Sequence, residues 1–166
     1  MSKNAVKQEV IRLLKPLALK KAIKQHILIT DDKKERDYAL EIFRDINAIF
    51  FYDLLKSDLV LIYLYDIEKQ PPDSAIGISD GFSTNSINRL NRTTKVSISS
   101  IGISLQALHK SKEYAIMVFL HELTHVLGYG EHDAAFHKFL NELISRYNKA
   151  TGENVVNDYY GLDNTT

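Results

Sequence analysis

Residues 116–132, IMVFLHELTHVLGYGEH, combine a helical pattern of apolar residues with two histidines four positions apart. Apolar side chains recur at three- and four-residue steps up to Leu127, which is the spacing of a buried helical face, and Gly128 is a typical residue after a helix end. At about 100° per residue, His121 and His125 lie about 40° apart on the face opposite the apolar stripe. The pattern predicts a helix that buries its aliphatic side and presents both imidazoles to a cleft.

The motif His121-Glu122-Leu123-Thr124-His125 has the form H-E-x-x-H. Two imidazole nitrogens one helical turn apart can converge on a single zinc ion at about 2.0–2.1 Å from each. Glu122 lies about 100° round the helix from His121, where its carboxylate is placed to reach a zinc-bound water. There it would accept a proton from water whose pKa zinc has lowered to about 7. The motif predicts His121 and His125 as zinc ligands and Glu122 as the catalytic base.

A catalytic zinc site takes a third protein ligand and leaves the fourth position to water. The chain contains no cysteine, so this ligand must be His, Asp or Glu. His132 is preferred because the glycines at 128 and 130 let the chain reverse and because neutral imidazole suits zinc, while Glu131 and Glu142 remain alternatives. Asp133 is expected to cap the next helix or to support a ligand. Candidate tyrosines for stabilising an oxyanion are Tyr129, Tyr159 and Tyr160.

Three other segments have the apolar spacing of helices. The first covers residues 6–17, where Pro16 is expected to kink or divide it. The second follows the cap candidates at positions 30–32 and extends to about Leu55. The third runs from about Asp133 to Lys149 and is closed by Gly152.

The middle of the chain predicts a small sheet. Residues 59–65, LVLIYLY, are too continuously apolar for one exposed face and predict a central strand buried on both sides. Residues 75–79 predict a second short strand. Residues 95–99 alternate apolar and hydroxyl side chains and predict a half-buried strand near the sheet edge, where an extended substrate could add as another strand. Residues 80–94 are rich in Ser, Thr, Asn and Gly and are expected to form a functional or mobile loop.

The composition is that of a globular protein with an uneven charge distribution. Of its 166 residues, 45% are hydrophobic and 25% charged, which excludes wholly disordered and fibrous proteins. The 21 basic and 21 acidic residues cancel, but the first thirty residues hold seven Lys/Arg against one acid. This basic helical arm is either a solvated face or a contact for nucleic acid, anionic membrane or an acidic partner. No segment is apolar enough for a membrane span or a secretory signal, so a cytoplasmic protein is expected.

The runs F-L-H-E-L-T-H (119–125) and G-E-H-D-A-A-F-H-K-F-L-N-E-L (130–143) resemble the SprT-like and WLM-type zinc metallopeptidases. The pattern of those families is H-E-x-x-H, a short loop, and H-D-x-x-F leading into an amphipathic helix. The resemblance implies that His121, His125 and His132 hold Zn²⁺ and that Glu122 is the base. The expected fold is accordingly α+β and zincin-like, with helices packed on a small mixed β-sheet and H-E-x-x-H on the active-site helix.

A single metallopeptidase-like domain is expected over residues 1–152, followed by a C-terminal tail at 153–166. The domain would consist of a helical N-terminal part (1–56), a small sheet and loop (57–110), and the metal-binding and closing helices (111–152). The expected function is hydrolysis of peptide bonds in a polypeptide substrate by a zinc-bound water that Glu122 activates.

Two alternatives to a peptidase remain open. The run from His125 to His132 is also similar to the three-histidine motif of a bacterial rRNA-maturation endoribonuclease family, which typically has Gly where this chain has Glu122. A zinc-dependent endoribonuclease is therefore the runner-up, and a non-catalytic, metal-stabilised binding domain is the third hypothesis. A metzincin is discounted, because its third ligand would fall on Glu131 and no methionine follows Met117 to form a Met-turn.

Overall fold

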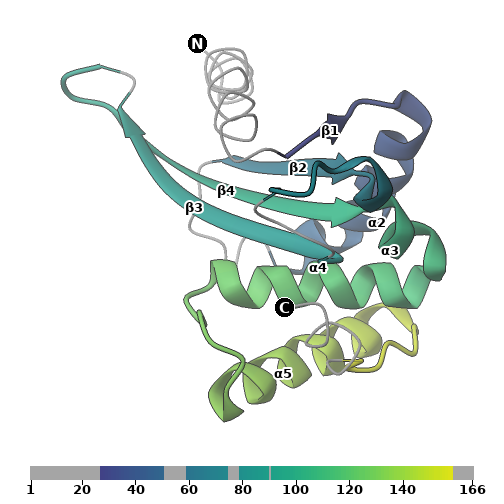
Figure 1. The fold of residues 1–166 in the computed structure, drawn as a ribbon. Helices are drawn as coiled ribbons and strands as arrows, with labels where there is room; N and C mark the ends of the chain where they lie inside the picture. Colours follow the sequence, from purple (N-terminus) through teal and green to yellow (C-terminus); the bar gives the residue numbers. More distant parts are fainter. Residues whose placement is uncertain (1–26, 51–58, 75–78, 90, 159–166) are drawn as a thin grey trace.

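The computed structural model describes residues 27–50, 59–74, 79–89 and 91–158. Within them the fold is α+β, with four α-helices packed on a mixed four-stranded sheet, which is consistent with the expected zincin-like fold. The elements in chain order are β1 (Ile29–Thr30), α2 (Lys33–Phe50), β2 (Leu59–Tyr65), the 3-10 helix η1 (Ile67–Lys69), β3 (Gly81–Arg89), β4 (Lys95–Ser104), α3 (Leu105–Lys110), α4 (Lys112–Val126) and α5 (Ala134–Thr151) (Figure 1). The predicted helix at 6–17 and the predicted strand positions 75–78 lie outside the described residues.

The sheet has the strand order β1-β2-β4-β3. β2 pairs antiparallel with β1 and parallel with β4, so the prediction of an interior strand at 59–65 is confirmed. The predicted burial of this strand on both sides is only partly confirmed, because Leu64 and Tyr65 are buried whereas residues 60–63 are half-buried.

The largest correction concerns β3 and β4. Residues 81–89, predicted to lie in a loop, form the edge strand β3, which pairs antiparallel with β4 from Gly81↔Ile103 to Arg89↔Lys95. β4 extends to Ser104 and lies between β2 and β3, so the expectation that residues 95–99 form a strand near the sheet edge was wrong. The sequence did not indicate β3 because, apart from Phe82, which packs on Tyr65, and the exposed Ile87, its side chains are polar and lack the apolar alternation typical of a strand.

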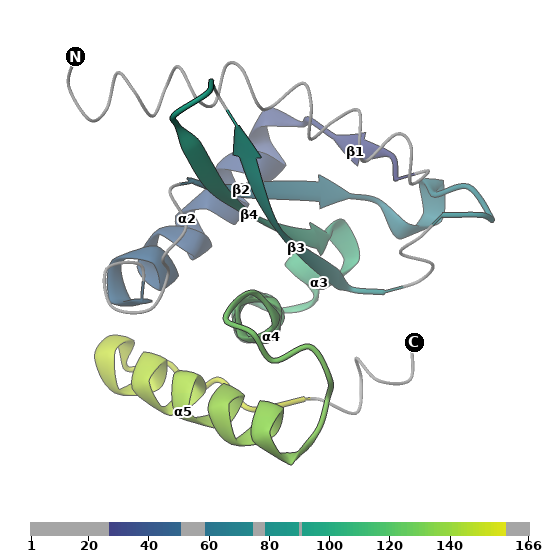
Figure 2. The same ribbon diagram turned by 90° about the vertical axis from the view of Figure 1, so that its left-hand side faces the viewer.

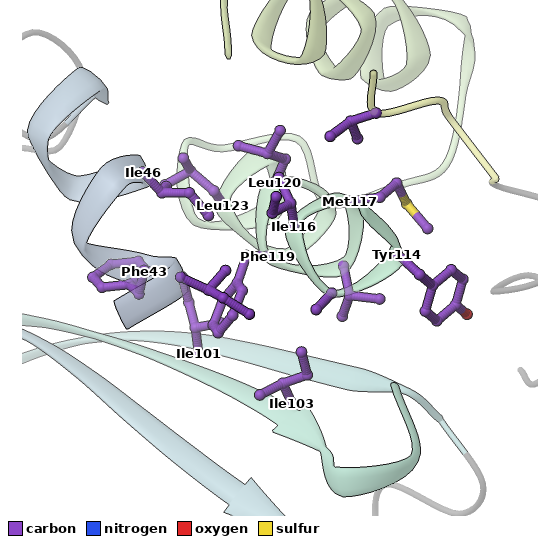
Figure 3. Packing of buried hydrophobic residues seen from close by; sticks show 14 of the residues in the cluster. Phe43, Ile46, Ile101, Ile103, Tyr114, Ile116, Met117, Phe119, Leu120 and Leu123 are labelled. Carbon is purple, nitrogen blue, oxygen red and sulfur yellow. The ribbon is translucent and has the colours of Figure 1, made fainter. Parts of the chain in front are cut away.

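Helix α4 lies between the sheet and α5, as Figure 2 shows with α4 seen nearly end on. Every residue from Tyr114 to Thr124 is buried. The predicted helix is confirmed and its two histidines line a cavity, but burial extends around the whole helix rather than covering the aliphatic side alone. The reason is that α2 and the sheet pack on one side of α4 and α5 on another. Figure 3 shows the resulting core, in which the labelled side chains are Phe43 and Ile46 from α2, Ile101 and Ile103 from β4, and Tyr114, Ile116, Met117, Phe119, Leu120 and Leu123 from α4.

The helix ends follow the capping residues that the sequence contains. Asp32 Oδ1 accepts hydrogen bonds from the first turn of α2, and Asp133 Oδ1 accepts one from Phe136 N at 2.9 Å. Gly128 and Gly152 have positive φ values of 112° and 75°, which a glycine adopts without the steric cost of a side chain. The predicted ends of α4 and α5 are therefore confirmed. None of the helices in the described part of the chain has both the length and the apolar composition that a membrane crossing requires.

Candidate functional site

Three histidines meet at the C-terminal half of α4. His121 and His125 come from successive turns of α4, and His132 comes from the loop between α4 and α5. His132 Nε2 lies 3.1 Å from His121 Nε2 and 3.0 Å from His125 Nε2. Glu131 and Glu142, the alternative third ligands, are exposed and do not belong to this group.

The donor set of this group fits a metal ion. Ligand nitrogens about 2.0–2.1 Å from a tetrahedral zinc ion lie roughly 3.3 Å apart, which is close to the observed spacing. His125 Nδ1 donates to the Tyr129 carbonyl oxygen at 2.7 Å, so in the neutral ring the lone pair is on Nε2, which faces the other two rings. Burial lowers the pKa of His121 to about 3 and also lowers that of His125, which keeps both rings neutral at pH 7. These three histidines could hold a metal ion.

Phe136 fixes the positions of all three rings. Its ring centroid lies 4.8 Å from those of His121 and His125 and 4.9 Å from that of His132. Because Asp133 caps the first turn of α5 at Phe136 N, the start of the helix and the aromatic contact are set together. The H-D-x-x-F pattern of this chain therefore supplies His132 of the histidine group, the Asp133 cap of α5 and the Phe136 ring that packs against the three histidines.

The carboxyl group of Glu122 is buried beside the start of β3. Only 6% of this residue is exposed, and burial raises the pKa of its carboxyl to about 7, although a hydrogen bond with the Ser83 side chain acts in the opposite direction. A Cβ added at Gly81 would lie 2.9 Å from Glu122 Oε1, so the absence of a side chain there lets β3 approach this closely. Glu122 is therefore placed and tuned to take up a proton near neutral pH.

A cavity of about 390 Å³ connects these groups. Its walls include Ser83, Thr84 and Asn85, three consecutive residues of β3. Because side chains alternate along a strand, Ser83 and Asn85 lie on one face of β3, and this face contacts Glu122 and Val126 of α4, so the cavity lies between β3 and the C-terminal half of α4. The remaining lining residues are Ser79, Asp80, Gly81, His121, Glu122, His125, Val126, Gly130 and His132.

The sequence missed the part of the site that β3 supplies. Asn85 Nδ2 donates to the Val126 carbonyl oxygen at 2.8 Å and so ties β3 to the last residue of α4. Asp80, at the other end of the cavity, accepts hydrogen bonds from Tyr114 Oη at 2.5 Å and from Ser104 Oγ at 3.3 Å. The signal for these residues was the run of Ser, Thr and Asn itself, which is typical of a polar cavity wall as much as of a loop.

The tyrosines named for an oxyanion role are not placed in this cavity. The ring of Tyr129 stacks on Phe139 with centroids 4.7 Å apart, and Tyr129 is not among the lining residues. Tyr159 and Tyr160 lie outside the described residues.

Comparisons with known proteins agree with the donor set. The model of the WLM domain, a zinc-metallopeptidase-like domain, matches residues 104–162, less than half of the chain. The matched part contains all three histidines, Glu122 and Phe136, and it begins after β3. No curated protein matches the chain, and no solved structure matches it. The WLM match indicates a metallopeptidase-like function for this part of the chain.

Proposed function

We propose that this protein is a zinc peptidase that hydrolyses peptide bonds in a polypeptide substrate. The observation that carries the proposal is the convergence of three neutral histidine Nε2 atoms beside a buried carboxyl group whose pKa is raised to about 7. A structural zinc site surrounds the metal with four protein ligands, whereas three ligands facing a cavity are typical of a catalytic one. We infer from the runs at 119–125 and 130–143 that the chain is related to the SprT-like and WLM-type peptidases.

His121, His125 and His132 would hold the zinc ion, which when bound supplies the Lewis acidity that makes water a nucleophile near neutral pH. Glu122 accepts the proton of the attacking water and then delivers it to the amine of the leaving group. The same carboxyl can do both because its raised pKa lets it hold and release a proton near pH 7. Gly81 and Ser83 of β3 lie against this carboxyl group, and the Ser83 side chain forms a hydrogen bond with it.

The position of β3 beside the cavity supports an extended peptide as the substrate. β3 is an edge strand of the described sheet, so the backbone groups on its outer side are available to pair with an added strand. From the sequence, residues 95–99 were expected to pair with an extended substrate, and we now assign this pairing to β3. Glu122 favours peptide hydrolysis over the endoribonuclease alternative, since that resemblance gives the carboxylate no role.

Two variants test the zinc and base assignments. Glu122→Gln should retain near-stoichiometric zinc and lose hydrolysis of an unfolded protein substrate, because an amide keeps the shape and cannot accept the proton. His132→Ala should lose zinc, while the neighbouring Glu131→Ala serves as the matched control and should keep it. Full activity in Glu122→Gln, or zinc lost in Glu131→Ala and kept in His132→Ala, would contradict the proposal. Cleavage of structured RNA alone would favour the endoribonuclease.

A further inference from the structure

The charges along β3 are strongly segregated. Between Asp80 and Glu113 the sequence contains no acidic residue and five Lys/Arg. Three of these cations, Arg89, Arg92 and Lys95, lie at the tip of the β3–β4 hairpin, which projects from the body of the molecule (Figure 1). All three are exposed, and within the described residues none of them forms an ion pair with an acid.

The arrangement at this tip works against stability. Arg89 is directly opposite Lys95 in the strand register, and like charges in facing positions repel each other. Ile87, on the same face as Arg89, is 75% exposed. A basic tip with an exposed apolar residue next to it is therefore better explained by a partner that it contacts than by the folding of the hairpin itself.

The other end of β3 carries the opposite charge. Asp80 lines the cavity, and its carboxylate is oriented by the hydroxyl groups of Tyr114 and Ser104, which are neutral donors. The nearby ammonium group of Lys110 lies over the Tyr114 ring, 4.1 Å from its centroid. Among the described residues no cation pairs with Asp80, so a fixed negative charge faces the cavity at the end farther from the hairpin.

The edge of β3 connects these two ends and passes the catalytic group. Nine residue steps separate Asp80 from Arg89, or about 30 Å at roughly 3.3 Å per residue. Glu122 lies against Gly81, and Asn85 is bonded to the end of α4. A chain laid along this edge would therefore meet a negative charge near the scissile bond and positive charges about six to eight residues away.

We propose that this polarity selects the substrate: an extended peptide with a cationic group at the Asp80 end and acidic side chains at the hairpin end. The proposal rests on the proposed peptidase function, since it places a peptide in the cleft. The cationic group is either a free N-terminal ammonium or a Lys/Arg side chain, and both would pair with Asp80 in the same way.

The test uses two fluorescent dodecapeptides with the same composition and a neutral core. One begins with two lysines and ends with two glutamates, and the other has the reverse order. Binding to the zinc-loaded Glu122→Gln protein, which should not cleave the peptide, is measured by fluorescence anisotropy. Cleavage is measured with the wild type. One of the two peptides should bind more tightly than the other, by about five-fold for each of its ends that pairs with the opposite charge on the protein. Added salt should reduce this difference in affinity. N-terminal acetylation separates the two sources: loss of the preference identifies the ammonium group, and its retention identifies the side chain.

Variants at each end test the origin of the preference. Asp80→Asn and the double variant Arg89→Gln/Lys95→Gln should each weaken binding of the preferred order and leave the reversed order nearly unchanged. Glu68→Gln in η1 and Lys149→Gln in α5 remove exposed charges away from the cavity and should leave the preference intact. Thermal unfolding verifies that each variant is folded. If Asp80→Asn does not fold, the double variant Arg89→Gln/Lys95→Gln alone tests the proposal.

Equal binding of the two peptide orders, or a preference that survives in the Asp80 and hairpin variants, would overturn the proposal. So would an oligonucleotide that binds through Arg89 and Lys95 while the two peptides bind equally, since the hairpin would then contact a phosphate chain. The two proposals fail separately. A binding preference for one peptide without any cleavage by the wild type would contradict the peptidase function and support the charge selection of the substrate. Cleavage without such a preference would support the peptidase function and contradict the charge selection.

Discussion

Replacing Gly81 by alanine tests whether β3 presses directly on the buried carboxyl of Glu122. The added Cβ would lie 2.9 Å from both Glu122 Oε1 and Val118 Cγ1, whereas ordinary van der Waals contact begins at 3.4 Å. Because the Glu122 side chain is enclosed, it or β3 must shift by roughly half an ångström. Overpacking of this kind costs about 2 kcal/mol, which corresponds to a fall in melting temperature of roughly 4–8 °C for a chain of this length. Displacing the base should also lower kcat/KM by about 10- to 100-fold.

The assay combines calorimetric melting, zinc content and the rate of peptide hydrolysis. Zinc should be retained, because the substitution contacts Glu122 and not the histidines. Gly130→Ala is the matched control for stability: this glycine also lines the cavity, but an added Cβ there meets nothing within 4 Å. We expect it to remain within about 0.5 kcal/mol of the wild type. A Gly81→Ala protein that melts like the wild type and hydrolyses at the full rate would refute the argument that β3 constrains the base.

Three further substitutions test the frame around the site by urea or thermal unfolding. Gly102→Ala should be more damaging than Gly81→Ala, at about 3 kcal/mol or more, because its Cβ would lie 2.0 Å from Phe82 Cε1; a smaller effect would mean that this ring moves aside freely. Asn85→Asp should cost about 1–3 kcal/mol, because a carboxylate would face the Val126 carbonyl oxygen without a donor, and unchanged stability would show that β3 is not tied to α4 there. Asp133→Ala should cost about 1 kcal/mol through the lost cap of α5, with Asp133→Asn close to the wild type; equal losses in the two variants would argue against capping.

The sequence predicted the parts of the site that follow from local periodicity. His121, Glu122 and His125 are set by the turn of one helix, and the two glycines before His132 indicated where the chain reverses. The capping residue Asp133 marked a helix start that the structure reproduces. Each of these inferences needs only the residues within a few positions of it.

The cavity wall could not be predicted in the same way. The position of Ser83 opposite Glu122, and that of Asp80 beside Tyr114, depend on the pairing of β3 with β4 and on the packing of the sheet against α4. These contacts join residues more than thirty positions apart in the sequence. The polar composition of β3 also concealed its strand character, because a polar edge strand that lines a cavity has the same amino-acid preferences as a surface loop.

The burial of α4 goes beyond the apolar face that the sequence predicted, and it explains why Glu122 and His121 of the H-E-x-x-H motif can have different chemistry. An open helix face would leave Glu122 hydrated with a pKa near its ordinary value of 4.5, and its carboxylate would then be a weak base. Burial raises the pKa of Glu122, which lies against β3, to about 7 and lowers that of His121, so desolvation makes the carboxylate a stronger base and keeps the imidazole neutral. The edge strand that we propose as the guide for the substrate thus also covers the carboxyl group of Glu122. Substitutions that loosen β3 should therefore reduce hydrolysis more than they reduce zinc binding, because the contacts that hold the three histidines come from Phe136 and the Tyr129 carbonyl and not from β3.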